Sequence, residues 1–450
     1  MATSRLAPQL HPTLLSRMAE ARARTDAVLQ MVPDSSVYDR PVPERHRLIF
    51  YLGHLEAFDW NLFGPVLALK SREPELDKLF AFGIDPIGDG LPTDTPDDWP
   101  SISRVQNYNQ GVRTALDDAL YAAGEAGSSV REIADGTLLN VAIEHRLMHA
   151  ETLAYLLHNL PVGRKIAQGA TLADLRPAPS PRQIAISAGI ATLGQSRDLP
   201  DGFGWDNEFG SHQIEVPGFS VDAFPVTNHE YLKFVRAGGY LESSYWKPED
   251  WEWKQRSGLA HPHFWKPRLN SFVAEPVTEW DFRAMFGTIP LPPSCPVYVT
   301  YAEASAFARW SGRKLPTEAQ WHRAAYGAPD GSERPFPWGE APPDWTRGNF
   351  HHQRWDPTPV AAHPSGASAF GVSDLIGNGW EWTSTEFGPL PGFESFPFYP
   401  GYSADFFDGK HFVMKGGSPR TDQSMLRRSF RNWFQPHYPH VYATFRCVEE

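Results

Sequence analysis

The sequence predicts a multi-domain protein in which an α-helical bundle is followed by an α+β domain with little regular structure. Three observations lead to this prediction. Residues 1–165 hold four stretches of helical composition and spacing. Residues 166–182 form a Pro-rich connector, with Pro177, Pro179 and Pro181 spaced two apart. In residues 183–450, short β-rich runs alternate with Gly, Pro and Asp turns, and aromatic residues are concentrated beyond residue 200.

The four helical stretches follow one another in the N-terminal part. Residues 12–32 combine apolar positions at helical spacing with an Ala/Arg-rich face, which is typical of an amphipathic helix. Residues 48–70, 103–123 and 136–159 are the other three predicted helices. Because polar or Pro-containing loops join them, we expect a four-helix bundle.

The C-terminal part is predicted to contain only short elements. Residues 183–194 and 212–228 have the composition of short strands bounded by turns. Helices are predicted at Asn228–Ala237 and at Tyr301–Ser311. A further helix begins at Thr317, a residue type that caps helix N-termini.

Composition and charge exclude several classes of function. Hydrophobic residues make up 41% of the chain and charged residues 21%, as in an ordinary globular protein. A formal net charge of −12 argues against a nucleic-acid partner. Two cysteines, Cys295 and Cys447, cannot form a disulfide framework, so we expect a reduced, cytoplasmic setting. We find no signal peptide and no apolar run of about 18 residues, and we expect no membrane partner.

Two histidines on the fourth predicted helix indicate a metal site. His145 and His149 stand four residues apart, so a helix places both on one face, where they can bind one ion. His54, in the apolar segment YLGHLEAFDW, is the natural third ligand from another helix. The alternative is three ordinary histidines that are hydrogen-bonded in the core. Imidazole suits Fe(II), Zn(II), Cu or Ni, so the spacing does not choose the metal.

Carboxylates close to this pattern are candidates for orienting the ligands. Asp59 and Glu151 could each accept a hydrogen bond from the distal N–H of a metal-bound histidine. Either could equally be a surface carboxylate. Tyr108 is either an active-site phenol or a core residue of the third helix.

Motifs in both parts of the chain resemble known families. The C-terminal part contains, in order, GRKLPTEAQWHRAAYG, PFPWG, DLIGNGWEWTST and KGGS…RRSFRNW…ATFRCV. Together they resemble the formylglycine-generating-enzyme-like, or sulfatase-modifying-factor, fold, an elaborated C-type-lectin-like domain. FYLGHLEAFDWN and HRLMHAETLAYLLHNLP resemble the ligand segments of DinB-type bundles, whose metal sites use three histidines. The combination resembles the EgtB-type sulfoxide synthases of ergothioneine biosynthesis over nearly the whole chain.

The resemblance implies a particular activity. Enzymes of this family use a non-haem Fe(II) ion held by three histidines, which match His54, His145 and His149. With O2 as co-substrate they join the sulfur of cysteine or γ-glutamylcysteine to C2 of the imidazole of hercynine (trimethylhistidine), giving a sulfoxide. The family's hercynine-binding pair matches Asn432 and Trp433. An indole face attracts a trimethylammonium group by about 0.5–2 kcal/mol.

Other predicted site residues are less closely tied to motifs. Arg113 and Asn109 are candidates for binding the carboxylate of the thiol donor. Tyr108 is our candidate for the tyrosine that assists proton transfer in this family. Tyr399 and Tyr402 are alternatives for that role.

The sequence departs from the usual family pattern at a few positions. Arg146 and Ala150 stand where the family usually has Glu and Gln, and GNGWEWT stands where GNVWEWT is usual. These departures leave the thiol donor unassigned. Side-chain oxygens near Asn378 and Glu381 raise the further possibility of a structural Ca²⁺ site, as in related folds.

Four alternative functions follow from the same motifs. A selenoneine synthase, which couples a selenosugar to hercynine, would share the iron and hercynine residues. A DinB-type metal-dependent thiol S-transferase would not need the second domain. A formylglycine-generating enzyme would need a cysteine close to Cys447, and Cys295 is distant in sequence. A non-catalytic binding protein would predict the loss of a histidine ligand, and all three are present. The sequence indicates no oligomeric state.

Overall fold

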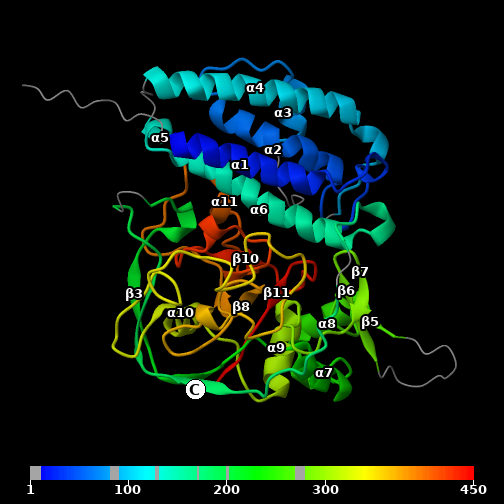
Figure 1. Ribbon diagram of the computed structural model, residues 1–450, viewed down its shortest axis with the longest axis vertical. Coiled ribbons are helices and arrows are strands. Elements are labelled where there is room, and N and C mark those ends of the chain that lie inside the picture. The colour runs from blue at the N-terminus through cyan, green and yellow to red at the C-terminus, as the bar shows by residue number, and fades with distance from the viewer. Residues whose placement is uncertain are drawn as a thin grey trace, which may run out of the picture. The chain divides into compact units, whose positions relative to one another are not determined.

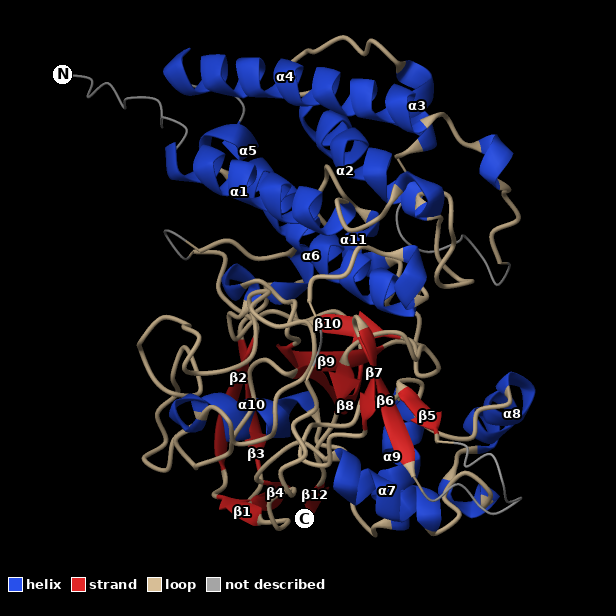
Figure 2. Cartoon of the chain, turned by 45° about the vertical axis from the view of Figure 1, so that its right-hand side comes forward, coloured by secondary structure: helices blue, strands red, loops and turns tan. Residues whose placement is uncertain are grey.

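The computed structural model describes residues 12–81, 91–126, 131–169, 172–198, 202–268 and 279–449. The chain divides into two compact units, Met1–Gln168 and Gly169–Glu450, and each is described by itself. All strands of the described residues belong to the second unit (Figure 2). None of the described helices has both the length and the apolar character that crossing a membrane requires.

The first unit is helical. Its helices are α1 (Pro12–Leu29), α2 (Leu48–Phe63), α3 (Pro74–Leu79), α4 (Ile102–Ala126), α5 (Arg131–Ala134) and α6 (Thr137–Asn159). Helix α1 lies along α6, and α2 contacts α3, α4 and α6 (Figure 1). Most residues of α2 and α6 are buried, including several polar ones. These two helices therefore form the centre of the bundle, where a polar site is enclosed by protein.

The four predicted helices are present, with different ends. Helix α2 ends at Phe63 instead of reaching residue 70, because Pro65 has no N–H to continue the helical hydrogen bonds. The short helices α3 and α5 were not expected. Pro74 at the first position of α3 could have indicated its start, because proline is favoured there.

The second unit contains four small sheets. They are β1-β4-β12, β10-β9-β8-β11, β2-β3 and β5-β6-β7 in spatial order. The first comprises β1 (Gln183–Ile186), β4 (Phe219–Asp222) and β12 (Val448–Glu449). The second comprises β8 (Gly379–Glu386), β9 (Phe412–Gly417), β10 (Asn432–Phe434) and β11 (Ala443–Thr444). The others are β2 (Gly189–Leu193) with β3 (His212–Val216), and β5 (Trp265–Pro267), β6 (Trp280–Ala284) and β7 (Gly287–Pro290).

Helices of the second unit are short. They are α7 (Asn228–Arg236), α8 (Pro248–Ser257), α9 (Tyr301–Trp310), α10 (Glu318–Tyr326) and α11 (Gly401–Ala404). The predicted cap of α10 is confirmed, since the Thr317 hydroxyl accepts from the N–H of Gln320 and the Gln320 side chain accepts from the N–H of Thr317. Helices α7 and α9 begin with the same arrangement at Thr227 and Thr300. Helix α8 was not predicted.

The core of the second unit lies between α10 and the sheets. Trp321 and Tyr326 of α10 pack with apolar residues from β2, β3 and β4, among them Ala191 and Val221. In the largest sheet, β10 pairs antiparallel with β9, so that Asn432 stands opposite Met414. This pairing fixes the position of the Asn432–Trp433 pair.

Candidate metal centre and candidate substrate residues

Three buried histidines of the first unit form one cluster. Each of His54, His145 and His149 offers a ring nitrogen, and the three nitrogens lie within 4.8 Å of one another. The ring centroids of His145 and His149 are 4.5 Å apart, and those of His54 lie 5.2 and 4.9 Å from them. Their exposed fractions are 1%, 4% and 1% in sequence order.

Helix geometry and ring stacking bring the three imidazoles together. His145 and His149 project from successive turns of α6, and His54 comes from α2, which contacts α6. The ring of Phe58 stacks on His145 at 3.5 Å, and Phe50 stacks on His54 at 4.8 Å. Both phenyl rings come from α2, so the apolar residues around His54 also hold the imidazole of His145.

The backbone fixes the tautomer of His54. Its Nδ1 atom lies 2.7 Å from the carbonyl oxygen of Phe80. A carbonyl only accepts, so Nδ1 donates and Nε2 keeps its lone pair. Asp59, a predicted acceptor of this kind, accepts from Arg146. A distal N–H bound to a backbone carbonyl is a common way to orient a metal-bound histidine.

The other ring nitrogens of the cluster suit a metal ion. Within the described part of the chain, His54 Nε2, His145 Nδ1 and both nitrogens of His149 have no hydrogen-bond partner. Leaving a buried polar atom unpaired costs about 1–3 kcal/mol. Nitrogen lone pairs that converge in an enclosed place are the donor set of a three-histidine metal site. The residues present therefore fit a mononuclear metal ion.

Burial also keeps these imidazoles neutral. It lowers the pKa of His54 from 6.5 to about 4, and it lowers the pKa values of His145 and His149 well below 6.5. The positive charge of Arg146 acts on all three in the same direction. Neutral imidazoles at pH 7 have lone pairs available for a metal.

The unexpected neighbour of the cluster is Arg146, which follows His145 directly. Its side chain is fully buried and donates to both carboxylate oxygens of Glu56 and to Oδ2 of Asp59. The sequence indicated only that a positive charge lies on the metal-binding helix. The structure shows this charge paired with two acids of α2.

The predicted donor-binding residues have partners inside the bundle. Arg113 donates to Asp26 and Glu56, and Asn109 donates to the carbonyl oxygen of Leu52 at 2.7 Å. The role of Arg113 and Asn109 in binding a thiol donor stays a prediction.

The predicted catalytic tyrosine also has a partner. The hydroxyl of Tyr108 donates to Oδ1 of Asp77 at 2.7 Å. Burial, together with this hydrogen bond, raises the pKa of Tyr108 above its ordinary value. Its role in proton transfer stays a prediction.

In the second unit, Asn432 and Trp433 begin strand β10. The indole of Trp433 stacks on Phe387 at 4.1 Å, with an interplanar angle of 7°. Tyr402 and Phe406 lie 5.5 and 5.6 Å from it, so Trp433 belongs to an aromatic cluster. Tyr399, the other alternative tyrosine, contacts Tyr402 at 5.5 Å.

A buried arginine fixes the start of this strand. Arg431 binds Glu318 through two hydrogen bonds of 3.1 Å, and it donates to the carbonyl oxygen of Gly388 at 2.9 Å. Its guanidinium also lies 5.0 Å from the ring of Phe387, the ring that stacks on Trp433. Arg431 and Phe387 are not among the predicted site residues, although Arg431 stands directly before the Asn–Trp pair.

The oxygens considered for calcium are used within the protein. Glu381 accepts from the guanidinium of Arg446 through both carboxylate oxygens, and from the indole of Trp321. The side-chain oxygen of Asn378 accepts from Asn349 and Thr358. These two residues therefore do not fit a calcium site.

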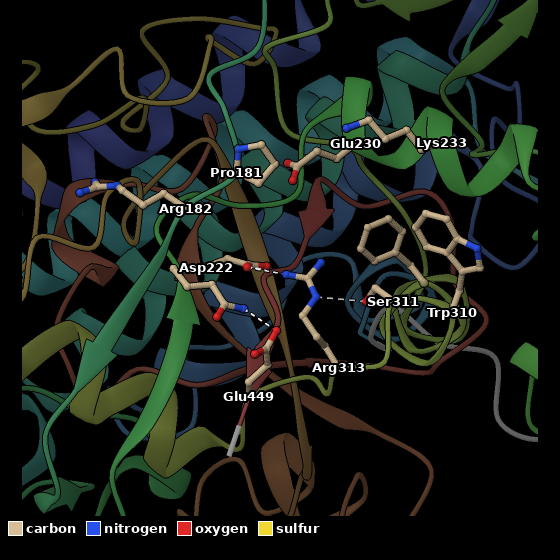
Figure 3. Close-up of a pocket in the computed structure, with 11 residues that line it drawn as sticks. Pro181, Arg182, Asp222, Glu230, Lys233, Trp310, Ser311, Arg313 and Glu449 are labelled. Carbon is tan, nitrogen blue, oxygen red and sulfur yellow. Dashed lines mark hydrogen bonds and ion pairs between the residues drawn. The ribbon is translucent and has the colours of Figure 1, made fainter.

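The second unit also has a surface pocket of about 320 Å³ (Figure 3). Its walls include Arg182, Asp222, Glu230, Lys233, Trp310 and Arg313. Arg313 binds Asp222 at 2.5 Å, and Gln183 donates to Glu449 at 2.8 Å. No predicted site residue lines this pocket.

Comparison with known proteins agrees with the two units. Residues 17–153 match the DinB superfamily, and residues 170–450 match the sulfatase-modifying factor enzyme 1-like domain. The fold and the histidine cluster thus define a protein that combines a DinB-superfamily bundle with a sulfatase-modifying-factor domain.

Relatives that align over nearly the whole chain identify the family within this class. The chain is 33% identical to hercynine oxygenase of Mycobacterium tuberculosis, over 97% of this chain and 98% of the relative. It is 34% identical to hercynine oxygenase of Mycolicibacterium thermoresistibile, over 97% and 94%. Ergothioneine biosynthesis protein 1 of Neurospora crassa is 28% identical over the whole of this chain and 60% of its own length. The chain belongs to the hercynine oxygenase family.

Proposed function

We propose that this protein is a non-haem Fe(II)- and O2-dependent sulfoxide synthase of ergothioneine biosynthesis. It joins the sulfur of cysteine or γ-glutamylcysteine to C2 of the hercynine imidazole. The observation that carries the proposal is the buried cluster of His54, His145 and His149, with its unpaired ring nitrogens, in a chain similar over its full length to hercynine oxygenases.

The overall reaction balances without a further reductant. A thiol (R–SH), the C2–H of the imidazole and O2 give the imidazolyl sulfoxide and one water. Forming the C–S bond and oxidising the sulfur each remove two electrons, and O2 takes up all four. An Fe(II) ion held by His54, His145 and His149 would bring O2 and the thiol sulfur together and supply the redox chemistry that couples them.

The protein contributes three things to this chemistry. His54, His145 and His149 present neutral nitrogen donors from an apolar, enclosed setting. The carbonyl of Phe80 holds the proton of His54 on Nδ1, away from the metal-binding nitrogen. In the second unit, the indole of Trp433 and the amide of Asn432 are the groups we assign to hercynine, since an electron-rich ring face attracts a quaternary ammonium.

Arg113 and Tyr108 would each have to release a present partner in order to act in this reaction. Arg113 already binds two carboxylates, so binding a donor carboxylate would require it to give up one of them. Tyr108 would likewise have to release Asp77 before it could donate a proton elsewhere.

A comparison of separate sulfur and selenium donors tests the proposal. The full chain is loaded with Fe(II) without oxygen, mixed with hercynine and exposed to air. Cysteine, γ-glutamylcysteine and a selenosugar are offered separately, and coupled product is detected by mass spectrometry. We expect a C2-coupled sulfoxide from cysteine or γ-glutamylcysteine. Coupling of the selenosugar alone, or no product from iron-loaded protein with any donor, would contradict the proposal.

A further inference from the structure

A series of ion pairs joins the four long helices of the first unit. Asp26 of α1 accepts two hydrogen bonds of 2.7 Å from Arg113 of α4. Arg113 also donates to Oε1 of Glu56 on α2, at 2.8 and 2.6 Å. Glu56 then shares its carboxylate with Arg146 of α6, which also binds Asp59 of α2. The series Asp26–Arg113–Glu56–Arg146–Asp59 thus alternates in charge across α1, α4, α2 and α6.

Arg146 uses its whole guanidinium to hold α2. Its Nε and Nη2 donate to Oδ2 of Asp59 at 2.9 and 2.6 Å. Its Nη1 and Nη2 donate to the two oxygens of Glu56 at 3.1 and 2.5 Å, and Nη2 also reaches the carbonyl oxygen of Leu55 at 3.0 Å. A planar guanidinium that is hydrogen-bonded to several acceptors fixes both the separation and the relative rotation of the two helices.

These contacts adjoin the metal ligands in the sequence of both helices. Arg146 follows His145, while Leu55, Glu56 and Asp59 come one, two and five residues after His54. Several ring nitrogens of the histidine cluster have no hydrogen-bond partner among the described residues. His54 is held by the Phe80 carbonyl, whereas His145 Nδ1 and both nitrogens of His149 are among the unpaired atoms. The position of the His145–His149 pair relative to His54 therefore depends on how α2 sits against α6.

We propose that Arg146 is a positioning residue for the metal centre, which sets the spacing of His54 to the His145–His149 pair by binding Glu56 and Asp59. This inference rests on the metal-binding part of the proposed function, and it is independent of hercynine and of the thiol donor. Buried ion pairs contribute little net stability compared with apolar residues of the same volume. The presence of one directly beside two ligand segments is therefore better explained by geometry than by stability.

The test measures metal affinity without substrate. Fe(II) binding to the full chain is followed anaerobically by competition with a colorimetric chelator, for the natural chain, Arg146→Met and Arg146→Lys. We expect Arg146→Met to lower the affinity about 10- to 100-fold, as loss of a group that orients metal ligands usually does. Arg146→Lys keeps the charge but loses the fork, and we expect a smaller loss. The absorption spectrum of bound Co(II) should change in Arg146→Met, because the ligand geometry changes.

A control separates positioning from general destabilisation. Arg47 also makes three side-chain hydrogen bonds, to Asp94 and to the carbonyl oxygens of Tyr38 and Asp94, without linking α2 to α6. We expect Arg47→Met to lower the stability of the metal-free protein while Fe(II) affinity stays within about threefold of the natural chain. An equal loss of affinity in Arg47→Met would overturn the inference.

A second variant covers the case in which Arg146→Met does not fold. Removing Arg146 leaves Asp59 buried without its ion pair and leaves Glu56 with Arg113 as its remaining ion-pair partner, which is destabilising. In the triple variant Arg146→Met, Glu56→Gln, Asp59→Asn these charges are absent. We expect it to fold and still to bind Fe(II) at least tenfold more weakly. Natural affinity in either variant would overturn the inference and leave the proposed reaction untouched.

Discussion

The Nδ1 atom of His54 and the carbonyl oxygen of Phe80 lie 2.7 Å apart, although 26 residues separate them in the chain. Phe80 directly follows α3, so the segment after this short helix supplies the acceptor that fixes the tautomer of His54, a proposed metal ligand. The contact places the lone pair of His54 on Nε2, the nitrogen without a partner among the described residues.

Gly53 leaves room for the ring of Phe80, whose carbonyl makes this contact. A Cβ atom at position 53 would lie 2.5 Å from Cε2 of Phe80, and Phe80 is fully buried, so its ring has no free space to enter. We expect Gly53→Ala to lower the free energy of unfolding by about 1–3 kcal/mol through overpacking. It should also weaken Fe(II) binding, because the Phe80 carbonyl is displaced from His54.

Gly111→Ala is the matched control. Gly111 lies inside α4, and apart from its chain neighbours and the surrounding backbone of α4 no atom stands within 4 Å of a Cβ built there. We expect it to raise the free energy of unfolding by up to about 1 kcal/mol, with Fe(II) affinity unchanged. Both quantities can be read from urea denaturation and chelator competition. Unchanged stability and affinity in Gly53→Ala would show that the Phe80 contact is not needed.

We expect His149 to contribute to Fe(II) binding and to lower the stability of the metal-free protein. Both of its ring nitrogens are buried and lack a hydrogen-bond partner within the described part of the chain. We expect His149→Leu to lower Fe(II) affinity at least about 100-fold, since one of three ligands is lost. The metal-free variant should be as stable as the natural chain or more so, because two unpaired polar atoms are removed.

The exposed histidine His229 provides a comparison for this prediction. It lies on α7 in the second unit, and His229→Leu should change neither Fe(II) affinity nor stability appreciably. Calorimetry of the metal-free proteins together with metal titrations measures both effects. Fe(II) binding of natural strength in His149→Leu would remove His149 from the ligand set.

Trp433 should select for the trimethylammonium group. A cation–π contact of about 0.5–2 kcal/mol corresponds to about a 2- to 30-fold effect on binding. We expect Trp433→Leu to raise the Kd for hercynine by this factor and to reduce the preference for hercynine over histidine. Trp345→Leu, which changes an indole that is 68% exposed, should leave both values unchanged. A preserved preference in Trp433→Leu would contradict this role.

The stability of the second unit should fall between pH 4.5 and 7 because of Glu303. Burial raises the pKa of Glu303 from 4.5 to about 7. Between these values the folded chain keeps the proton while the unfolded chain releases it, so the free energy of unfolding falls as pH rises. The total is about 3 kcal/mol, and it is complete above pH 7. Glu303→Gln should remove this component.

Glu230 offers the control for this pH dependence. It occupies the same place in the N-terminal cap of α7 that Glu303 occupies in α9, but it is only half-buried. Denaturation at pH 5 and pH 8 should show a smaller difference for Glu303→Gln than for the natural chain or Glu230→Gln. An identical pH profile in all three proteins would rule out Glu303 as the cause.

Local patterns predicted the helices that carry the histidine cluster. The spacing of His145 and His149 and the apolar neighbours of His54 were enough to predict three histidines on two helices, and the structure brings them together. The cap at Thr317 was equally readable, because a Thr followed three residues later by Gln has a simple hydrogen-bonding reason.

Contacts between distant segments could not be predicted in the same way. The acceptor for His54 is a backbone carbonyl, which every residue carries, so no residue type marks it. The partners of Arg146 depend on how α2 faces α6, which spacing along one helix does not reveal. In the sheet that contains β10, strand β8 pairs with β9 and with β11, which follow much later in the chain. These strands lie in an aromatic-rich region whose sequence shows no clear alternation.

The most direct measurement is the yield of C2-coupled product per bound iron. The natural chain and His145→Ala are loaded with increasing Fe(II) without oxygen, and each is then exposed to air with hercynine and the accepted thiol donor. We predict that product from the natural chain rises with iron up to one ion per chain, and that His145→Ala gives none. Equal product from His145→Ala, or a yield that does not depend on iron, would contradict a coupling reaction at the three-histidine site.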